Sequence, residues 1–297
     1  MTSNAINIQT IAELLTGIKT EILSRGGVPK FPLSTLPELN QKIWGLHKGL
    51  TVVGARSSMG KSAFVLQIAR DLADQMIPVW IVSLEMDVPS MIERLFCQQM
   101  EVDNFDLLSG KLNYNSGLQQ KWDAFEKWVS KIPLLLTSGL GKNFGEINDL
   151  VAKLNPKPKI IIVDYIQGIR QSEKERSELN EYIRNFRQLM IEGDMVGILA
   201  SQMNRAIIDN TDKRPSLENL KSTGVLEEHA DMVLMLFWEY FYTRKEENKN
   251  KYEVIVGKNR NGRTGHHELY FKPEYYLFQE LGQAMGGDEI IHNERMY

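Results

Sequence analysis

The sequence has little cysteine: Cys97 is the only one in 297 residues. A single thiol cannot form an intramolecular disulfide, which excludes the disulfide-stapled secreted scaffolds and fits a reducing cytoplasm. Cys97 lies in the amphipathic stretch MIERLFCQQM, which favours a buried small apolar side chain over a catalytic thiol. No apolar run approaches the roughly 20 residues of a membrane span. The N-terminus MTSNAINIQT also lacks the basic start and apolar block of a secretory signal.

An excess of charge of one sign is lacking as well. The formal net charge is −3, which does not favour nucleic acid as a partner, because domains that bind it are often basic. It does not exclude nucleic acid either, since a ring of subunits can bind a strand through a few loops on an acidic body. The remaining composition, 42% hydrophobic and 25% charged residues, is that of an ordinary globular protein with one large domain or two small ones.

The sequence also lacks a metal-binding cluster at recognisable spacing. No histidine has a cysteine or histidine partner at the spacing of a zinc site. The adjacent His266 and His267 lie in a strand-like stretch, so we expect their side chains on opposite faces. Internal repeats and low-complexity tracts are absent too. The five histidines are His47, His229, His266, His267 and His292.

Apolar periodicity divides the chain into an N-terminal helix and a sheet-forming body. Residues 8–25 have apolar side chains at helical spacing, and GGVPKFP ends the helix. This helix either packs on its own domain or docks on a neighbouring subunit. From about residue 50, continuously apolar stretches alternate with amphipathic ones, which predicts a mainly parallel sheet buried on both faces. The expected strands are GLTVVGA, PVWIVSLE, PLLLTS, KIIIVDY, MVGILASQ and DMVLMLF.

The last part of the body has a different sequence pattern. YEVIVGKNRNGRTGHHELYF has two β-rich arms around an Asn-Gly pair, which predicts a hairpin. The preceding TRKEENKNKYE is charged and is expected to be a solvated loop. We therefore divide the chain into a helix and tether at 1–30, a body at 31–281 and a C-terminal tail at 282–297, which we expect to be poorly ordered.

The stretch VVGARSSMGKSAF is similar to a phosphate-binding loop but departs from it at one position. The strict pattern G-x-x-x-x-G-K-[ST] would put glycine at position 55, where the chain has Ala55 and the glycine comes one residue early, at Gly54. The context fits, because an apolar strand enters the loop and a helical stretch leaves it, so backbone N–H groups face the phosphates. Lys61 would reach the β- and γ-phosphates of ATP, and Ser62 would ligate Mg²⁺. The residues expected to bind the nucleotide in this loop are Ala55, Arg56, Ser57, Ser58, Met59, Gly60, Lys61, Ser62 and Ala63.

Three further polar residues stand at the ends of expected strands. Asp164 closes KIIIVDY in the manner of a Walker B carboxylate, which holds the Mg²⁺ shell. Glu85 closes PVWIVSLE and is either the base that orients and deprotonates the attacking water or a solvated turn residue, with neither favoured. Gln202 closes MVGILASQ and is a candidate to hydrogen-bond the γ-phosphate and report ATP or ADP, with Arg205 as the next charged residue.

A basic run, VGKNRNGRTG, lies on the expected hairpin. It carries Lys258, Arg260 and Arg263. Such a run is more often a solvated basic turn. The functional alternative is an arginine finger supplied to the ATP of a neighbouring subunit.

Taken together, these blocks resemble the DnaB family of replicative hexameric helicases. ARSSMGKS is similar to the ARP-S/G-MGKT loop of that family, in which alanine also occupies the first Walker glycine position. The other blocks match in order: SLEM, IIIVDYIQ, SQMNR, DKRPSLENLKSTGVLEEHADMVLML and VGKNRNG. The resemblance runs from about residue 8 to about residue 280. It implies an α/β fold with a RecA-like P-loop core, a mainly parallel sheet flanked by helices, a C-terminal hairpin and an N-terminal linker helix that docks on the adjacent subunit.

The resemblance also implies roles for the phosphate-site residues. Lys61 and Ser62 would bind phosphate and Mg²⁺, Asp164 the metal shell, and Glu85 the catalytic water, with ATP lying between subunits. Ser57 stands where the family usually has proline, which is expected only to loosen the loop.

Two further groups take their roles from the family. Lys258 and Arg260 would act in trans on the γ-phosphate of the neighbour. The DNA-binding loop corresponds to LENLKSTG, in which Lys221, Ser222 and Gly224 would hold the DNA backbone. Lys221 replaces the usual arginine, which loses bidentate geometry but keeps the charge.

The function implied is an ATP-dependent DNA helicase motor that forms a ring, commonly a hexamer, on single-stranded DNA in the cytoplasm of a bacterium or a phage-infected host. A helicase loader is a further candidate partner. The helical collar domain that contacts primase in the family has no counterpart here, which argues against primase binding. Two alternatives remain: an ATPase of related fold that binds DNA or protein without unwinding, such as a KaiC-like switch, or a regulatory subunit of a helicase ring.

Overall fold

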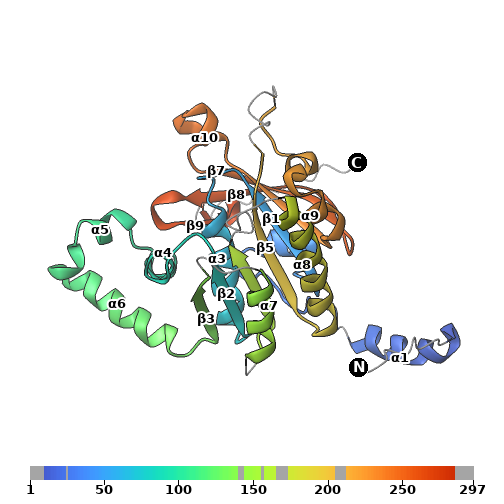
Figure 1. Ribbon diagram of the computed structural model, residues 1–297. Helices are drawn as coiled ribbons and strands as arrows, with labels where there is room; N and C mark the ends of the chain where they lie inside the picture. The colour runs from blue at the N-terminus through green and yellow to red at the C-terminus, as the bar shows by residue number, and fades with distance from the viewer. Residues whose placement is uncertain are drawn as a thin grey trace.

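A nine-stranded sheet forms the centre of the molecule (Figure 1). The computed structural model describes residues 10–24, 26–139, 144–154, 157–164, 173–204 and 212–284. Within these residues the strand order is β3-β2-β4-β5-β1-β6-β7-β8-β9. The strands are β1 (Gly49–Ala55), β2 (Val79–Ser83), β3 (Leu134–Ser138), β4 (Ile160–Asp164), β5 (Val196–Gln202), β6 (Met232–Phe237), β7 (Lys251–Asn259), β8 (Gly265–Lys272) and β9 (Leu277–Glu280).

The first six strands of the sheet are parallel, and the last three are antiparallel to their neighbours. All six expected parallel strands are present within a residue or two of their expected bounds. The expected hairpin is confirmed as β7 and β8. The short strand β9, which closes the sheet after η6 (Pro273–Tyr275), was not predicted.

Helices cover both faces of the sheet (Figure 1). On one face α3 packs with α4 and α6 in the larger apolar cluster. On the other face α7, α8 and α9 form a second apolar cluster with the opposite sides of the same strands. The helices are α1 (Ile11–Ser24), α2 (Pro37–Ile43), α3 (Lys61–Asp74), α4 (Val88–Met100), α5 (Asn104–Leu108), α6 (Ser116–Val129), α7 (Phe144–Lys153), α8 (Glu173–Glu192), α9 (Gly224–His229), α10 (Glu239–Thr243) and α11 (Leu281–Ala284).

The prediction that the parallel sheet is buried on both faces is confirmed for the inner strands but was wrong for β3. Every residue of β1, β2, β4 and β6 is buried. In β3, Leu135 is 49% exposed and no residue is fully buried. The reason is position, because β3 is the edge strand of the sheet and pairs only with β2. An apolar run in the sequence does not say whether its strand is central or at an edge.

The N-terminal helix α1 stands away from the body (Figure 1). Thr10 and Glu13 exchange the hydrogen bonds of an N-terminal cap. The apolar face of the helix is open, with Ile11 81% and Ile18 47% exposed. Of the two interpretations of this helix, packing on its own body is therefore wrong for the described residues. Residues 8, 9 and 25 of the expected helix lie outside them.

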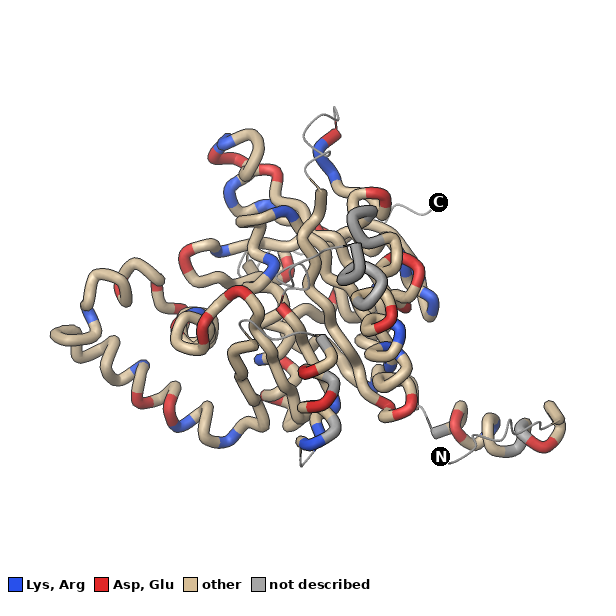
Figure 2. The backbone as a smooth tube through the Cα atoms, viewed as in Figure 1, with Lys and Arg blue, Asp and Glu red and all other residues tan. Residues whose placement is uncertain are grey.

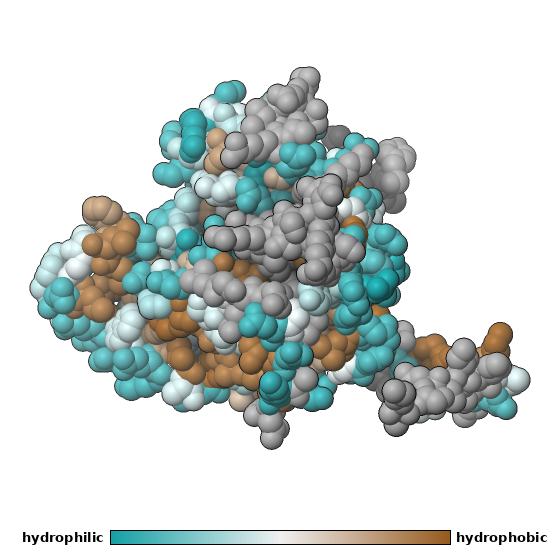
Figure 3. Space-filling model, in the orientation of Figure 1, coloured by the Kyte–Doolittle hydropathy of each residue, from teal (hydrophilic) through white to brown (hydrophobic). Residues whose placement is uncertain are grey.

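The arm formed by α4, α5 and α6 also projects from the sheet (Figure 1). Phe96, Trp122 and Phe125 pack ring against ring inside it. Hydrophobic areas appear in Figure 3 on this arm, on α1 and over the middle of the body. Phe105 and Leu108 on α5 are exposed. Charged residues of both signs follow the helices and loops around the sheet (Figure 2).

Cys97 lies inside this arm, on α4. Its side chain is fully buried, and burial, followed by the charges of Glu93 and Asp103, raises the pKa of its thiol to about 12. The expectation that Cys97 is a buried side chain is confirmed. Among the described residues, no helix is both long and apolar enough to cross a membrane.

The division at residues 30 and 281 stays a prediction. The one-turn helix α11 extends past the expected boundary of the body. Residues 285–297 of the expected tail lie outside the described residues.

Candidate nucleotide site

The loop between β1 and α3 has the strand–loop–helix form that the sequence predicts. Gly60 caps α3 with φ 77° and ψ 14°, a left-handed conformation that favours glycine over any side chain. A Cβ atom there would also lie 3.3 Å from the ring of Phe278. Ser57 and Ser58 are exposed at the tip of the loop. The first turn of α3 therefore begins beside a solvent-accessible loop, and the N-terminus of a helix in such a place suits an anion.

The back of the loop is anchored in the core. Met59 is 1% exposed, and its carbonyl oxygen accepts a hydrogen bond from the hydroxyl of Tyr252. Tyr252 packs against Phe271 and Phe278, which stack on each other with ring centroids 4.4 Å apart. These rings come from β7, β8 and β9, so the C-terminal strands fix the position of the loop.

The displaced glycine of the motif has a packing reason. Side chains of a strand alternate between faces, so Gly54 faces the cluster on the α8 side and Ala55 faces the cluster on the α3 side. A Cβ atom on Gly54 would lie 2.7 Å from Met203 Cε and 3.1 Å from Leu220 Cδ2. Ala55 is fully buried, and its methyl group fills space on its own face. Glycine at 54 thus leaves room for the ends of the Met203 and Leu220 side chains, and alanine fits at 55.

Lys61 and Asp164 meet behind the loop. Lys61 begins α3 and Asp164 ends β4, two strands away from β1. The distance from Lys61 Nζ to Asp164 Oδ1 is 2.5 Å, and the side chains are only 8% and 6% exposed. Burying two opposite charges is unfavourable unless they are paired, so the ion pair stabilises both in place.

Ser62 and Asp164 have the chemistry of a magnesium site. Ser62 is partly exposed in the first turn of α3 and follows Lys61, whose side chain pairs with Asp164. Hydroxyl and carboxylate oxygens are ligands that Mg²⁺ accepts, commonly together with water and phosphate oxygens. These residues fit the predicted metal ion.

Glu85 and Gln202 lie at the same edge of the sheet. Gln202 ends β5 in direct register with Ala55. Glu85 follows β2, and the preceding Leu84 donates its backbone N–H to the carbonyl oxygen of Asp164 at 2.6 Å. Glu85 is exposed, which agrees with either of its two interpretations, so its catalytic role stays a prediction.

Lys258 and Arg260 lie at the opposite edge. Lys258 Nζ donates to the carbonyl oxygen of Glu227 at 2.6 Å, and Arg260 donates to that of Glu228 at 3.1 Å, both in the last turn of α9. Burial and the neighbouring charge of Arg260 lower the pKa of Lys258. Arg260 is level with Leu50, because its N–H donates to Asp231 and the N–H of Asp231 donates to Leu50, which leaves about 17 Å along β1 to Ala55 at roughly 3.3 Å per residue. Lys258 lies opposite Val233, which pairs with Val52, so its backbone is about 10 Å from Ala55 along the strand and its side chain turns to α9. A single chain therefore does not bring these cations to its own Lys61.

The predicted DNA-binding segment forms η4 (Leu217–Thr223) and the start of α9. Ser216 and Asn219 cap this turn, with Ser216 N 2.6 Å from Asn219 Oδ1. Gly224 is exposed, and among the described residues no atom outside its own helix and chain neighbours lies within 4 Å of the position a Cβ would take. The side chains of Lys221 and Ser222, and all of Arg205, lie outside the described residues.

Sequence reasoning placed Arg56 in the nucleotide loop but missed its partners on α10. Its guanidinium lies over the rings of Phe241 and Tyr242, at 5.8 and 5.6 Å. Sequence reasoning also missed Asp231. Asp231, at the start of β6, pairs with Arg187 and Arg260. The only sequence signal for Asp231 was a carboxylate in front of an apolar strand, which is too common to single out a residue.

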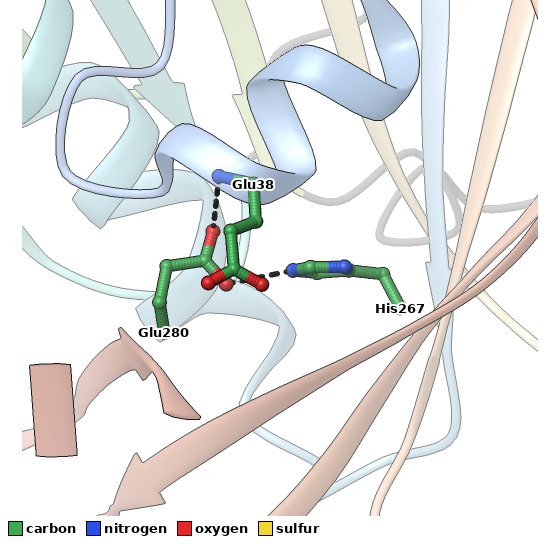
Figure 4. A group of neighbouring side chains, drawn as sticks. All are labelled: Glu38, His267 and Glu280. Atoms are coloured by element: carbon green, nitrogen blue, oxygen red, sulfur yellow. Dashed lines mark hydrogen bonds and ion pairs between the residues drawn. The ribbon is translucent and has the colours of Figure 1, made fainter. Parts of the chain in front are cut away.

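Sequence reasoning also missed one cluster of metal-ligand types, Glu38, His267 and Glu280 (Figure 4). Glu280 is 1% exposed, and its Oε1 accepts the backbone N–H groups of Glu38 at 2.9 Å and Leu39 at 3.0 Å. Its Oε2 lies 2.7 Å from His267 Nε2. Both oxygens of Glu280 therefore already have partners, and the cluster holds β8 and β9 to α2 without an ion. His266 lies on the other face of β8, 58% exposed, as expected.

Known proteins resemble this chain in both sequence and structure. The sequence model of the family described as the DnaB-like helicase C terminal domain matches residues 33–280. The replicative DNA helicase DnaB of Geobacillus stearothermophilus is 31% identical over 273 residues, covering 85% of this chain and 57% of that protein. The replicative DNA helicase DnaC of Bacillus subtilis (strain 168) is 30% identical over 260 residues, covering 82% of this chain and 55% of that protein. The chain thus spans a little over half the length of these relatives.

Solved structures agree with the fold. A DnaB-like replicative helicase, studied with its interactions with primase, superposes with a TM-score of 0.82 at 27% identity, covering 93% of this chain and 68% of that one. A second solved structure, described as an ATPase domain, gives a TM-score of 0.81 at 28% identity, covering 93% of this chain and all of that one. The predicted RecA-like α/β core is confirmed. This chain belongs to the family of DnaB-like helicase C-terminal domains.

Proposed function

We propose that this chain is the ATP-driven motor of a DNA helicase that forms a ring on single-stranded DNA and couples hydrolysis to translocation and unwinding in replication. The observation that carries the proposal is the buried Lys61–Asp164 pair behind the capped loop before α3. The relatives support it, because those named above are replicative helicases. No observation in the described part of the chain favours the alternatives, a DNA-binding ATPase without unwinding or a regulatory subunit.

Each residue at the carboxyl edge has a distinct task in this proposal. Lys61 would exchange Asp164 for the β- and γ-phosphates of ATP, and Asp164 and Ser62 would hold Mg²⁺. When bound, Mg²⁺ neutralises charge that develops on the phosphate oxygens. Glu85 orients the attacking water and accepts its proton. Gln202 hydrogen-bonds the γ-phosphate and senses its loss.

The proposed active site is shared between two subunits. The side chains of Lys258 and Arg260 bind the last turn of α9, and Arg260 lies about 17 Å along β1 from the loop of its own chain. We therefore expect them to meet a γ-phosphate on a neighbour. A head-to-tail contact of this kind generates a closed ring when its rotation closes, commonly a hexamer in this proposal. The open apolar face of α1 supplies a second contact to the neighbour. Lys221, Ser222 and Gly224 would bind the DNA backbone, and a helicase loader stays a predicted partner.

The first experiment is ATP hydrolysis with and without single-stranded DNA over a range of protein concentrations. Because the site forms only between subunits, the rate per subunit should rise with concentration. DNA should raise it further, and Lys61→Ala should abolish it. If hydrolysis is indifferent to DNA and concentration, the motor proposal fails, and a switch or regulatory subunit takes its place.

Unwinding needs its own assay, because DNA-stimulated hydrolysis alone fits a non-unwinding ATPase. A forked duplex with one labelled strand should be separated in the presence of ATP and Mg²⁺. Arg260→Ala should keep nucleotide binding while losing both hydrolysis and strand separation. A normal rate in this variant would remove the shared-site argument.

A further inference from the structure

Asp231 is the centre of a cluster of charged groups at the amino edge of the sheet. Its side chain is only 12% exposed. Oδ2 accepts the backbone N–H of Leu50 at 2.9 Å and Arg187 Nε at 3.0 Å. Oδ1 accepts Arg187 Nη2 at 2.7 Å and Arg260 Nη1 at 3.3 Å. One carboxylate thus joins β1, α8 and the loop between β7 and β8.

The backbone is shaped to admit this carboxylate. Gly49 has φ 108°, and a Cβ atom there would overlap Asp231 Oδ2. Arg260 is tied to the same residue through its main chain, since its N–H donates to the carbonyl oxygen of Asp231 at 2.9 Å. Its Nη2 donates to the carbonyl oxygen of Glu228 at 3.1 Å. The side chain of Arg260 nevertheless remains 45% exposed. It is therefore held in one orientation while still facing the outside of the subunit.

We propose that Asp231 is a positioning residue for Arg260, which it holds in the orientation needed to reach the γ-phosphate of the neighbouring subunit. This inference rests on the trans role of Arg260 in the proposed function. A free arginine side chain samples many rotamers, and ordering it at the moment of catalysis is entropically unfavourable. Because Asp231 orders the Arg260 side chain before the nucleotide binds, this entropic cost does not arise during catalysis. It also offsets the mutual repulsion of Arg187, Lys258 and Arg260, which lie around it.

The variant Asp231→Asn separates positioning from folding. The buried N–H of Leu50 needs an acceptor, so the amide oxygen will take the place of Oδ2. The amide NH₂ then takes the place of Oδ1 and faces two other donors, Arg187 Nη2 and Arg260 Nη1. Arg260, which has the longer contact, is released. We expect kcat for ATP to fall about 10- to 100-fold while KM stays within about twofold, since the residues that bind phosphate are unchanged.

Arg187→Gln is the matched control. It removes the bidentate partner of Asp231 but leaves Asp231 with Arg260 and Leu50. We expect its kcat to stay close to that of the unaltered protein, and the thermal unfolding of both variants is measured alongside. If both variants lower kcat equally, Asp231 only stabilises the edge of the sheet, and the inference is overturned.

Mixed rings give the deciding test. A subunit with Asp231→Asn has an intact Lys61 but a misplaced Arg260. A subunit with Lys61→Ala lacks the phosphate-binding lysine but has a correctly placed Arg260. Mixing the two inactive proteins before assembly should restore about one quarter of the normal rate, the fraction of head-to-tail interfaces that receive both intact parts in a random equal mixture. The reference mixture is Arg260→Ala with Lys61→Ala.

The two mixtures distinguish the ways of failing. Suppose that Lys61→Ala rescues Arg260→Ala but does not rescue Asp231→Asn. Asp231 then affects hydrolysis at the nucleotide site of its own subunit rather than at the neighbour's site. That result overturns the positioning role of Asp231 and leaves the shared active site standing. If neither mixture regains activity, the shared active site itself is wrong, and the inference falls with it. Rescue of both mixtures together with an active Arg187→Gln variant supports the proposal.

Discussion

Exchanging the residues at positions 54 and 55 tests whether packing explains the departure from the strict phosphate-loop pattern. The double variant Gly54→Ala with Ala55→Gly restores the glycine of the formal motif. The structure predicts that the double variant is less stable than the unaltered chain and hydrolyses ATP no faster. At position 54 the new methyl group meets Met203 Cε at 2.7 Å and Leu220 Cδ2 at 3.1 Å. At position 55 a fully buried methyl group is lost.

The size of the effect follows from these contacts. Overpacking costs about 1 to 3 kcal/mol, and the low end applies here because the new methyl group meets the ends of two flexible side chains. Losing the buried methyl of Ala55 costs about 0.8 kcal/mol, and glycine within a strand adds roughly 0.5 to 1 kcal/mol. Effects at adjacent positions are not strictly additive, so we expect the double variant to lose about 2 to 3 kcal/mol in all.

The assay is urea denaturation of both single variants and the double variant, followed by ATP hydrolysis of the folded protein. Each single variant should be destabilised, and the double variant most of all. Hydrolysis should not exceed that of the unaltered chain. A double variant as stable as the original, or one that hydrolyses ATP faster, would refute the packing explanation of Gly54 and Ala55.

Three further outcomes are expected. The folded pKa of Cys97, about 12, lies above the ordinary 9.0, so its contribution to stability is complete below pH 9 and is lost as pH rises from 9 towards 12; the alkaline loss in urea unfolding should shrink in Cys97→Ala. Glu280→Gln puts an amide NH₂ against His267 and should destabilise the fold by about 1 to 2 kcal/mol, as measured by thermal unfolding. Ile18→Asp, on the open face of α1, should leave unfolding unchanged but reduce the oligomer seen by light scattering.

The parallel strands were predictable because each is a short apolar run closed by a polar residue. Such runs mark β1, β2, β4, β5 and β6 without reference to the rest of the chain. The edge position of β3 and the existence of β9 depend on which strand pairs with which. That information comes from contacts between distant segments, and no local pattern carries it.

The same distinction holds for the site. Asp164 and Gln202 could be assigned because strands that run in parallel end at one edge of the sheet, so residues that close them converge. Asp231 could not be assigned, because its partners come from α8, β1 and the hairpin loop. Glu38, His267 and Glu280 escaped notice for the same reason, since they lie on three separate segments.

The direction of the strands explains why one chain cannot complete its own site. β1 runs from the edge at Asp231 to the edge at Lys61, and β7 returns antiparallel to β6, so the residues that end β7 arrive where the parallel strands begin. Lys258 and Arg260 are therefore placed on the far edge by topology rather than by a chance rotamer. No movement of the Arg260 side chain spans the roughly 17 Å from its backbone to Ala55, since a fully extended arginine reaches less than half of that. If Arg260 acts in hydrolysis at all, it acts on a second copy of this chain.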